Sequence, residues 1–104
     1  MTRPALPIVF TPTAERHVEK ARVWWAENRL AAPDAILEEL RAALELVASQ
    51  PACGVPVVSA RFRGVRRILL QRIDYFLYYR VAPRERRLEV LAFWHARRGT
   101  TPPL

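Results

Sequence analysis

The residues best suited to chemistry lie near the end of the chain, where His95 is followed by Arg97 and Arg98. An imidazole can transfer a proton near neutral pH, and guanidinium groups can stabilise charge on a phosphoryl oxygen. Cleavage of RNA through attack of a 2′-hydroxyl needs these groups. The spacing is weakly specific, however, and by itself favours a structural role, with His95 bonded to a loop carbonyl and the arginines paired with Glu85, Glu89 or a partner's carboxylates.

A second group of arginines precedes this cluster and includes tyrosines nearby in the sequence. Arginine and tyrosine together can bind phosphates and stack on nucleobases, and both are also common in protein interfaces. If the fold brings the two groups together, they form one cationic surface. The candidate binding residues are Arg61, Arg63, Arg66, Arg67, Arg80, His95, Arg97 and Arg98.

The whole chain is basic, with a net charge of +7 over 104 residues. This charge makes nucleic acid, an acidic protein surface or anionic lipid plausible partners. Lys20 is the single lysine, and all other basic residues are arginines. A GC-rich genome produces the same bias at ordinary surface positions, and we favour this explanation for any individual arginine.

Several classes of protein are disfavoured by composition and motifs. Cys53 is the single cysteine, so no disulfide can form within the chain, and two histidines with one cysteine make no structural zinc site. The sequence lacks a glycine-rich phosphate loop, a Gly-x-Ser-x-Gly elbow and a His-Glu-x-x-His motif. It shows no signal peptide and no membrane-spanning run. We therefore expect a cytoplasmic protein without metal or cofactor.

The chain is long enough for one domain, residues 1–104. After a short strand at residues 7–10, Thr11 can cap a helix that begins at Pro12 and runs to about residue 28. Apolar spacing predicts a second helix over about residues 34–49. The short linker predicts an antiparallel helical hairpin, and the pair Trp24 and Trp25 is expected in its core.

Three strand patterns follow the helices, at residues 65–71, 75–81 and 88–94. Residues 58–63 also alternate and form either a further short strand or an extended lead-in. The tail, residues 100–104, either frays or packs as an extended strip. The order β-α-α-β-β-β predicts an α+β fold, in which the hairpin packs on one face of a three-stranded antiparallel meander and leaves the other face partly uncovered.

Two of these segments resemble the RelE/ParE superfamily of toxins from bacterial type II toxin–antitoxin modules. They are Tyr75-Phe76-Leu77-Tyr78-Tyr79-Arg80-Val81 and Val90-Leu91-Ala92-Phe93-Trp94-His95-Ala96-Arg97-Arg98, and the resemblance extends over nearly the whole chain. It implies a cytoplasmic toxin that a cognate antitoxin holds inactive in a hetero-oligomer, usually through an extended or helical segment. We expect an acidic, amphipathic segment to cover apolar surface of the hairpin.

The superfamily includes two mechanisms on one fold. RelE-like members cleave messenger RNA on the ribosome, whereas ParE-like members act against DNA gyrase without a known nuclease site. In the nucleases an arginine commonly follows the aromatic residue that starts the third sheet strand, and basic or aromatic catalytic groups close the chain. Here Phe76 stands at that position and the chain ends in Pro-Pro-Leu. The resemblance therefore favours the ParE-like branch, with gyrase as the target and no catalytic residue.

Two alternatives stay open at this point. The first is a metal-independent, RelE-like endoribonuclease acting on messenger RNA at the ribosome, with His95, Arg97 and Arg67 as catalytic groups and Tyr79 as a substitute proton donor if it faces solvent. The second is a non-toxic basic module, or a decayed toxin, that titrates antitoxin or binds nucleic acid.

Overall fold

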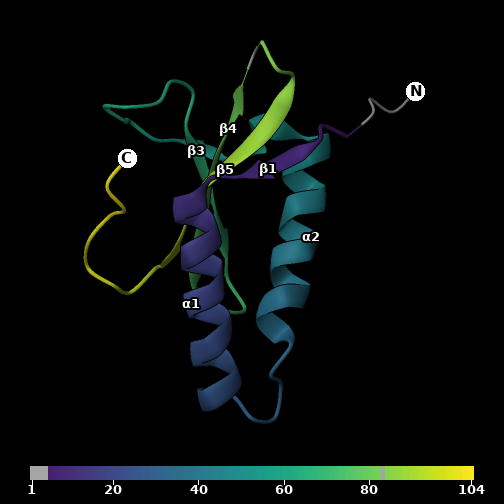
Figure 1. Cartoon of the computed structure of the whole chain (residues 1–104), viewed down its shortest axis with the longest axis vertical. Helices are drawn as coiled ribbons and strands as arrows, with labels where there is room; N and C mark the ends of the chain where they lie inside the picture. The colour runs from purple at the N-terminus through teal and green to yellow at the C-terminus, as the bar shows by residue number, and fades with distance from the viewer. Residues whose placement is uncertain (1–4, 83) are drawn as a thin grey trace.

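The computed structural model describes residues 5–82 and 84–104. Two helices cover one face of a five-stranded mixed sheet (Figure 1). In chain order the elements are β1 (Ile8–Phe10), α1 (Pro12–Asn28), α2 (Ala35–Ser49), the 3-10 helix η1 (Pro51–Cys53), β2 (Val55–Pro56), β3 (Arg66–Leu70), β4 (Tyr75–Ala82) and β5 (Arg87–His95). Neither α1 nor α2 combines the length and the apolar character that a membrane span needs.

The sheet is larger than the predicted meander. Its strand order is β1-β5-β4-β3-β2, so the antiparallel meander is present as β3, β4 and β5. The predicted three-stranded meander is only part of the sheet, because β1 also pairs with β5 in parallel and β2 pairs with β3. A strand of three residues carries too little alternation to reveal its partner. Residues 58–63 form no strand; they belong to a loop whose base is closed by the Val57 N–H donating to the Val65 carbonyl at 2.8 Å.

Both helices lie where the apolar spacing predicts them. The Thr11 hydroxyl accepts the Ala14 N–H at 3.1 Å, and Pro12 occupies the first turn, where its missing N–H costs nothing. The prediction that Trp24 and Trp25 both lie in the core is wrong for Trp24, which is 43% exposed. Trp25 is half-buried, and its indole N–H donates to the Ala32 carbonyl at 2.8 Å.

A bulge in β5 decides which residues face the helices. Tyr78 pairs with Ala92 while Tyr79 pairs with Val90, so the ladder between β4 and β5 shifts register there. As a result Val90 and Phe93 both join the core beneath the helices, although strict alternation would place them on opposite faces. Ala92 and Trp94 join a separate cluster on the second face, which is the face turned away from the helices.

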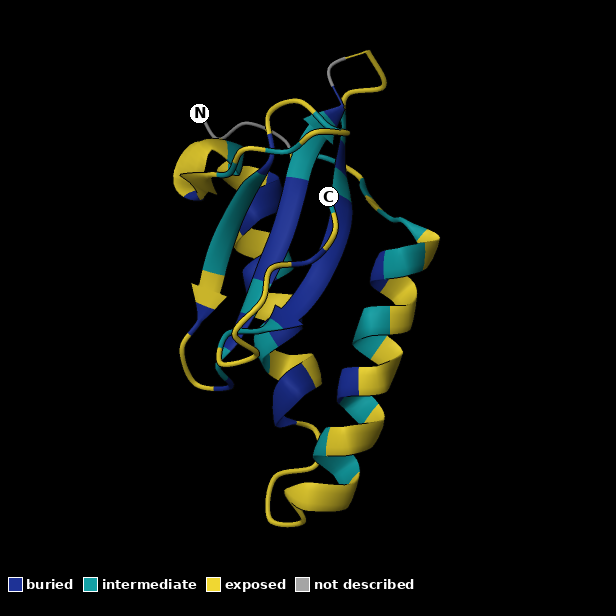
Figure 2. Ribbon diagram, turned by 90° about the vertical axis from the view of Figure 1, so that its left-hand side faces the viewer, coloured by how far each residue is buried: buried dark blue, intermediate teal, exposed yellow. Residues whose placement is uncertain are grey.

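The second face is partly covered, as the sequence predicts. The loop at residues 57–64 contributes Val57 and Phe62 to the cluster there, and the tail contributes Leu104. The Trp94 indole N–H donates to the Thr100 carbonyl at 2.8 Å, and Pro102 is buried. The tail therefore packs as an extended strip across the strands (Figure 2).

Candidate functional site

A hollow of about 620 Å³ lies between the second face and the tail. Its walls combine one cation from β3 with three aromatic side chains from β4 and β5. The lining residues from the sheet are Arg67 of β3, Phe76 and Tyr78 of β4, and Trp94 and His95 of β5. The other lining residues are Ala96, Gly99, Thr100 and Thr101 at the start of the tail.

Arg67 is held in place by aromatic neighbours. Its guanidinium carbon lies 4.1 Å from the centroid of the Phe76 ring, and its Nη1 donates to the Tyr78 hydroxyl at 3.1 Å. A cation over an aromatic face is attracted by the ring quadrupole and loses little conformational freedom when it binds an anion. Arg67 can therefore bind a phosphate or a carboxylate at this place.

Of the four residues predicted for a nuclease centre, the structure brings Arg67 and His95 to this hollow. His95 accepts the Arg97 N–H on Nδ1 at 3.2 Å, whereas a bond to a loop carbonyl was the structural expectation. The Arg97 side chain pairs with Asp74 at 3.4 Å, so the expected pairing with Glu85 or Glu89 is wrong for this residue. Arg97 does not line the hollow.

Tyr79 lies on the opposite side of the sheet, under the helices. Its residue is 1% exposed, so the condition that it faces solvent is not met. The hydroxyl donates to the Pro51 carbonyl at 2.8 Å and accepts the Gly54 N–H at 2.9 Å. Burial raises the pKa of Tyr79 to about 12, which holds its proton firmly. Tyr79 therefore ties η1 to the sheet and cannot meet a substrate on the second face.

The remaining candidate arginines separate into engaged and outward groups. Arg66 lies on the helical face and donates to the Gly54 carbonyl at 2.6 Å. Arg80 pairs with Glu89 at 2.8 Å, and Arg87 approaches the same carboxylate at 3.3 Å. The outward group is Arg61 and Arg63, which are exposed on the loop at residues 57–64, and Arg98, whose guanidinium carbon lies 3.8 Å from the Trp94 ring centroid.

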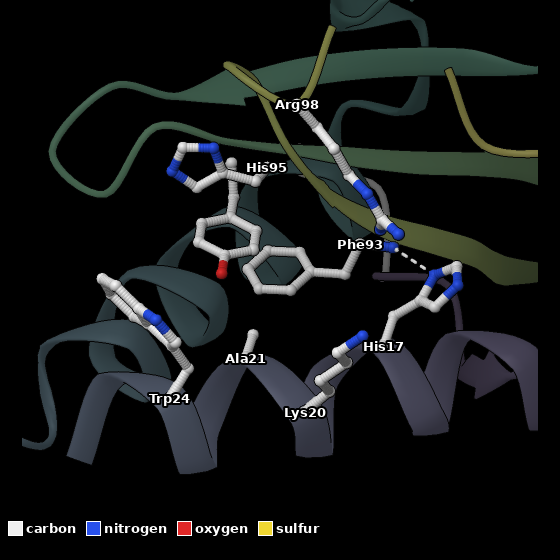
Figure 3. A pocket seen from close by; sticks show the side chains of 8 residues that line it. His17, Lys20, Ala21, Trp24, Phe93, His95 and Arg98 are labelled. Atoms are coloured by element: carbon white, nitrogen blue, oxygen red, sulfur yellow. Dashed lines mark hydrogen bonds between the residues drawn. The ribbon is translucent and has the colours of Figure 1, made fainter. Parts of the chain in front are cut away.

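A second cavity lies on the helical side, between α1 and the ends of β4 and β5 (Figure 3). Sequence reasoning missed the residues that α1 contributes to it, His17, Lys20 and Trp24. Together with Ala21, these residues have the spacing of one helical face. That spacing was the sequence signal that could have identified them as neighbours. Because Ala21 also belongs to the apolar stripe that packs in the core, the polar residues beside it were interpreted as a solvent-exposed side of the helix.

His17 completes an open edge of the sheet. β1 pairs with β5 only as far as Val90, and the Phe93 N–H beyond it donates to Nδ1 of His17 at 3.2 Å. Burial lowers the pKa of His17, and the nearby charges of Arg98, Arg16 and Lys20 lower it further. The imidazole is therefore held neutral, with Nδ1 as the acceptor. Within residues 5–82 and 84–104, no three His, Cys, Asp or Glu side chains gather as metal ligands.

Comparisons with known proteins agree with this architecture. Among solved structures, the fold is similar to a chain of the chromosomal ParDE toxin–antitoxin system from P. aeruginosa, with 17% identity, a TM-score of 0.63, and coverage of 88% of this chain and 96% of that one. It is also similar to a chain of the RelBE2 toxin–antitoxin complex from Mycobacterium tuberculosis, with 20% identity, a TM-score of 0.61, and coverage of 88% and 99%. A comparison with curated proteins finds no significant match.

Because the identities are only 17% and 20%, the similarity to these two chains establishes the fold alone. The sequence itself matches the family described as the ParE toxin of the type II toxin–antitoxin system parDE over residues 8–99. That match runs from β1 to the turn after β5 and so includes every described helix and strand. The chain therefore belongs to the ParE toxin family of type II toxin–antitoxin systems.

Proposed function

We propose that this toxin inhibits growth by acting on DNA gyrase and that a cognate antitoxin neutralises it in a hetero-oligomer. The choice of gyrase rests on where the structure places the residues that a nuclease would need. Phe76 stands under the Arg67 guanidinium, and the Tyr79 hydroxyl is buried on the other side of the sheet. An acid–base mechanism needs two proton-transferring groups at the scissile phosphate, and among the residues that line the hollow only His95 carries an imidazole or a carboxyl group.

The second candidate is a ribosome-dependent messenger RNA endoribonuclease. One observation favours it: Arg67 and His95 line the same hollow, so one phosphate could contact both. The two activities are separated by testing the purified chain for inhibition of gyrase supercoiling and for messenger RNA cleavage on translating ribosomes. We expect inhibition of supercoiling and no cleavage. Cleavage without inhibition would reverse the choice, and no growth defect in a host lacking the antitoxin would favour a decayed toxin or binding module.

We place the contact with the target on Arg61 and Arg63. Arg66 and Arg80 already have partners in the chain, and the Arg80 guanidinium also packs 5.2 Å from the Phe62 ring centroid. Phe62 anchors the loop at residues 57–64 to the second face, which leaves Arg61 and Arg63 projecting from an anchored loop. Such cations can bind an acidic surface at little entropic cost.

Reversing both loop charges tests this surface. We expect Arg61→Glu with Arg63→Glu to weaken inhibition of supercoiling at least about tenfold, equivalent to about 1.4 kcal/mol, because attraction becomes repulsion. Arg84→Glu with Arg86→Glu is the matched control, since it makes the same change of charge on the exposed turn between β4 and β5. Equal loss in both double variants would show that only the net charge matters.

We place the antitoxin on the outer side of the helices and along α2 and β3. Five large apolar residues of the helical hairpin are exposed: Val23, Trp24, Leu30, Leu37 and Leu46. A hollow of about 460 Å³ runs between α2 and β3, where Leu46 and Leu69 line it. In the described sheet β2 pairs only with Arg66 and Arg67. The outer edge of β3 beyond them can therefore accept an extended partner segment.

Leu46→Glu is expected to weaken binding of the cognate antitoxin at least about tenfold, because a charge replaces apolar contact area. Leu46 is 43% exposed, so the free toxin should keep its thermal midpoint. Val58→Glu is the matched control, because Val58 is 100% exposed on the distant loop. Isothermal titration calorimetry measures both affinities. If antitoxin gives the toxin no thermal stabilisation, the partner is misassigned.

A further inference from the structure

The cavity on the helical side has a volume of about 410 Å³. It is distinct from the hollow under the tail, and His95 is the one residue that lines both. The lining residues are His17, Lys20, Ala21 and Trp24 of α1, Tyr75 of β4, Phe93 and His95 of β5, and Arg98 of the following turn. None of them is acidic, and a volume of this size is typical of sites for small ligands.

One end of the cavity is cationic. Lys20 from α1 and Arg98 from the turn after β5 reach toward the same end, beside His17 (Figure 3). In the described part of the chain, neither Lys20 nor Arg98 has a carboxylate within ion-pair distance. The pKa of the neighbouring His17 is lowered first by burial and then by the charges of Arg98, Arg16 and Lys20. Two cations without carboxylate partners at one end of a cavity attract an anion, and phosphate suits both groups.

The rest of the cavity is aromatic. Tyr75 and Phe93 stack with ring centroids 4.6 Å apart, and the His95 ring stands edge-on to Tyr75 at 5.1 Å. Trp24 stands at the end opposite His17, and the small side chain of Ala21 lies between them (Figure 3). The exposed indole of Trp24 therefore faces a space bounded by other rings, which suits a planar ligand.

We propose that this cavity binds a nucleotide, with its phosphate between Lys20 and Arg98 and its base against Trp24 and Phe93. A free mononucleotide and the 5′-phosphorylated end of a single strand present the same chemistry to these residues. The inference goes beyond the proposed action on gyrase and holds for either target, because the four residues proposed to bind the nucleotide do not line the hollow that contains Arg67.

The test is calorimetric titration of the full chain with adenosine 5′-monophosphate, with adenosine and inorganic phosphate as its two halves. We expect the nucleotide to bind at least about tenfold more tightly than either half, because both ends of the cavity contribute. Arg98→Gln, Lys20→Gln and Trp24→Leu should each weaken binding at least about fivefold. The matched control is Arg97→Gln, which removes the same charge one residue earlier from a side chain that pairs with Asp74 outside the cavity.

Several outcomes would overturn the proposal: no binding by the folded chain, phosphate alone binding as tightly as the nucleotide, or Arg97→Gln weakening binding as much as Arg98→Gln. Lys20 and Arg98 are exposed, so circular dichroism should show an unchanged unfolding midpoint in the Lys20 variant and a small decrease in the Arg98 variant, which loses its contact with the Trp94 ring. A 5′-phosphorylated oligoribonucleotide separates the two sources. If it binds as tightly as the mononucleotide and responds to Arg98→Gln, the site takes a strand end; if only the mononucleotide binds, the site takes a free nucleotide.

Discussion

Trp94→Ala is expected to lower the free energy of unfolding by about 3–5 kcal/mol, the usual cost of truncating a buried aromatic residue. Trp94 is 9% exposed and lies where three parts of the molecule meet. Its ring centroid is 5.4 Å from that of His17 on α1, and Arg98 packs over its face. Its N–H holds the tail through the Thr100 carbonyl. Alanine would remove all of these contacts at once.

Trp94→Phe is the matched variant, because it keeps an aromatic ring and removes the N–H. We expect it to cost about 1 kcal/mol, the typical net value of one hydrogen bond, plus a small packing term. Urea unfolding measures both variants, and the protection of the tail against limited proteolysis reports whether the tail is released. Retention of tail protection in Trp94→Ala would show that Pro102 and Leu104 hold the tail by themselves.

The second large effect is expected at Gly54, where the chain passes close to Tyr79. A Cβ at this position would lie 2.5 Å from the Tyr79 hydroxyl oxygen and 3.0 Å from the Arg67 carbonyl oxygen. The Gly54 φ of −78° suits any residue, so the cost of Gly54→Ala is steric rather than conformational. We expect a loss of about 1–3 kcal/mol from overpacking, with the hydrogen bonds between Tyr79, Gly54 and Pro51 weakened in addition.

Tyr79→Phe tests the same contact from its other side. Alone it should cost about 1–3 kcal/mol, because the Pro51 carbonyl and the Gly54 N–H lose their buried partner. Combined with Gly54→Ala it should cost less than the sum of the single changes, because the phenylalanine lacks the hydroxyl that makes the 2.5 Å contact with the new Cβ. Urea unfolding of the four proteins gives the coupling free energy, and strict additivity would contradict the steric explanation.

The same residue predicts alkaline sensitivity. The pKa of Tyr79 is raised from 10.0 to about 12 by burial, so the neutral phenol is favoured in the folded state. Its contribution to stability is fully present below the unfolded pKa of 10.0 and is lost as the pH rises toward 12. Tyr79→Phe should therefore lose less stability than the parent chain as the pH rises above 10.0. Parallel pH profiles for the two proteins would contradict this assignment.

Much of the fold could be predicted because the local signals agree with the tertiary structure. Thr11 and Pro12 determine where α1 begins, and the apolar spacing of both helices marks the faces that pack on the sheet. The aromatic alternation of β4 and the turn after it identify the hairpin of β4 and β5. These signals are short-range, so one sequence is enough to reveal them.

The tertiary structure decided the features that depend on distant pairing. The parallel contact of β1 with β5 joins residues about eighty positions apart, and no local pattern encodes it. The bulge at Leu91 reverses the alternation of β5, so which face Phe93 and Trp94 occupy could not be counted from the strand sequence. That one shift brings Phe93 under α1 and leaves Trp94 to hold the tail.

The chemistry divides in the same way. The sequence by itself determined the basic character of the chain and its aromatic strands, and the family resemblance added that nuclease members commonly carry an arginine where this chain has Phe76. Only the tertiary structure decided that Tyr79 is buried, that Arg97 turns to Asp74, and that Lys20 and Arg98 meet across a cavity. The physical reason is that residue type decides which interactions a side chain can make, whereas burial and contacts with residues far along the chain decide which of them it makes.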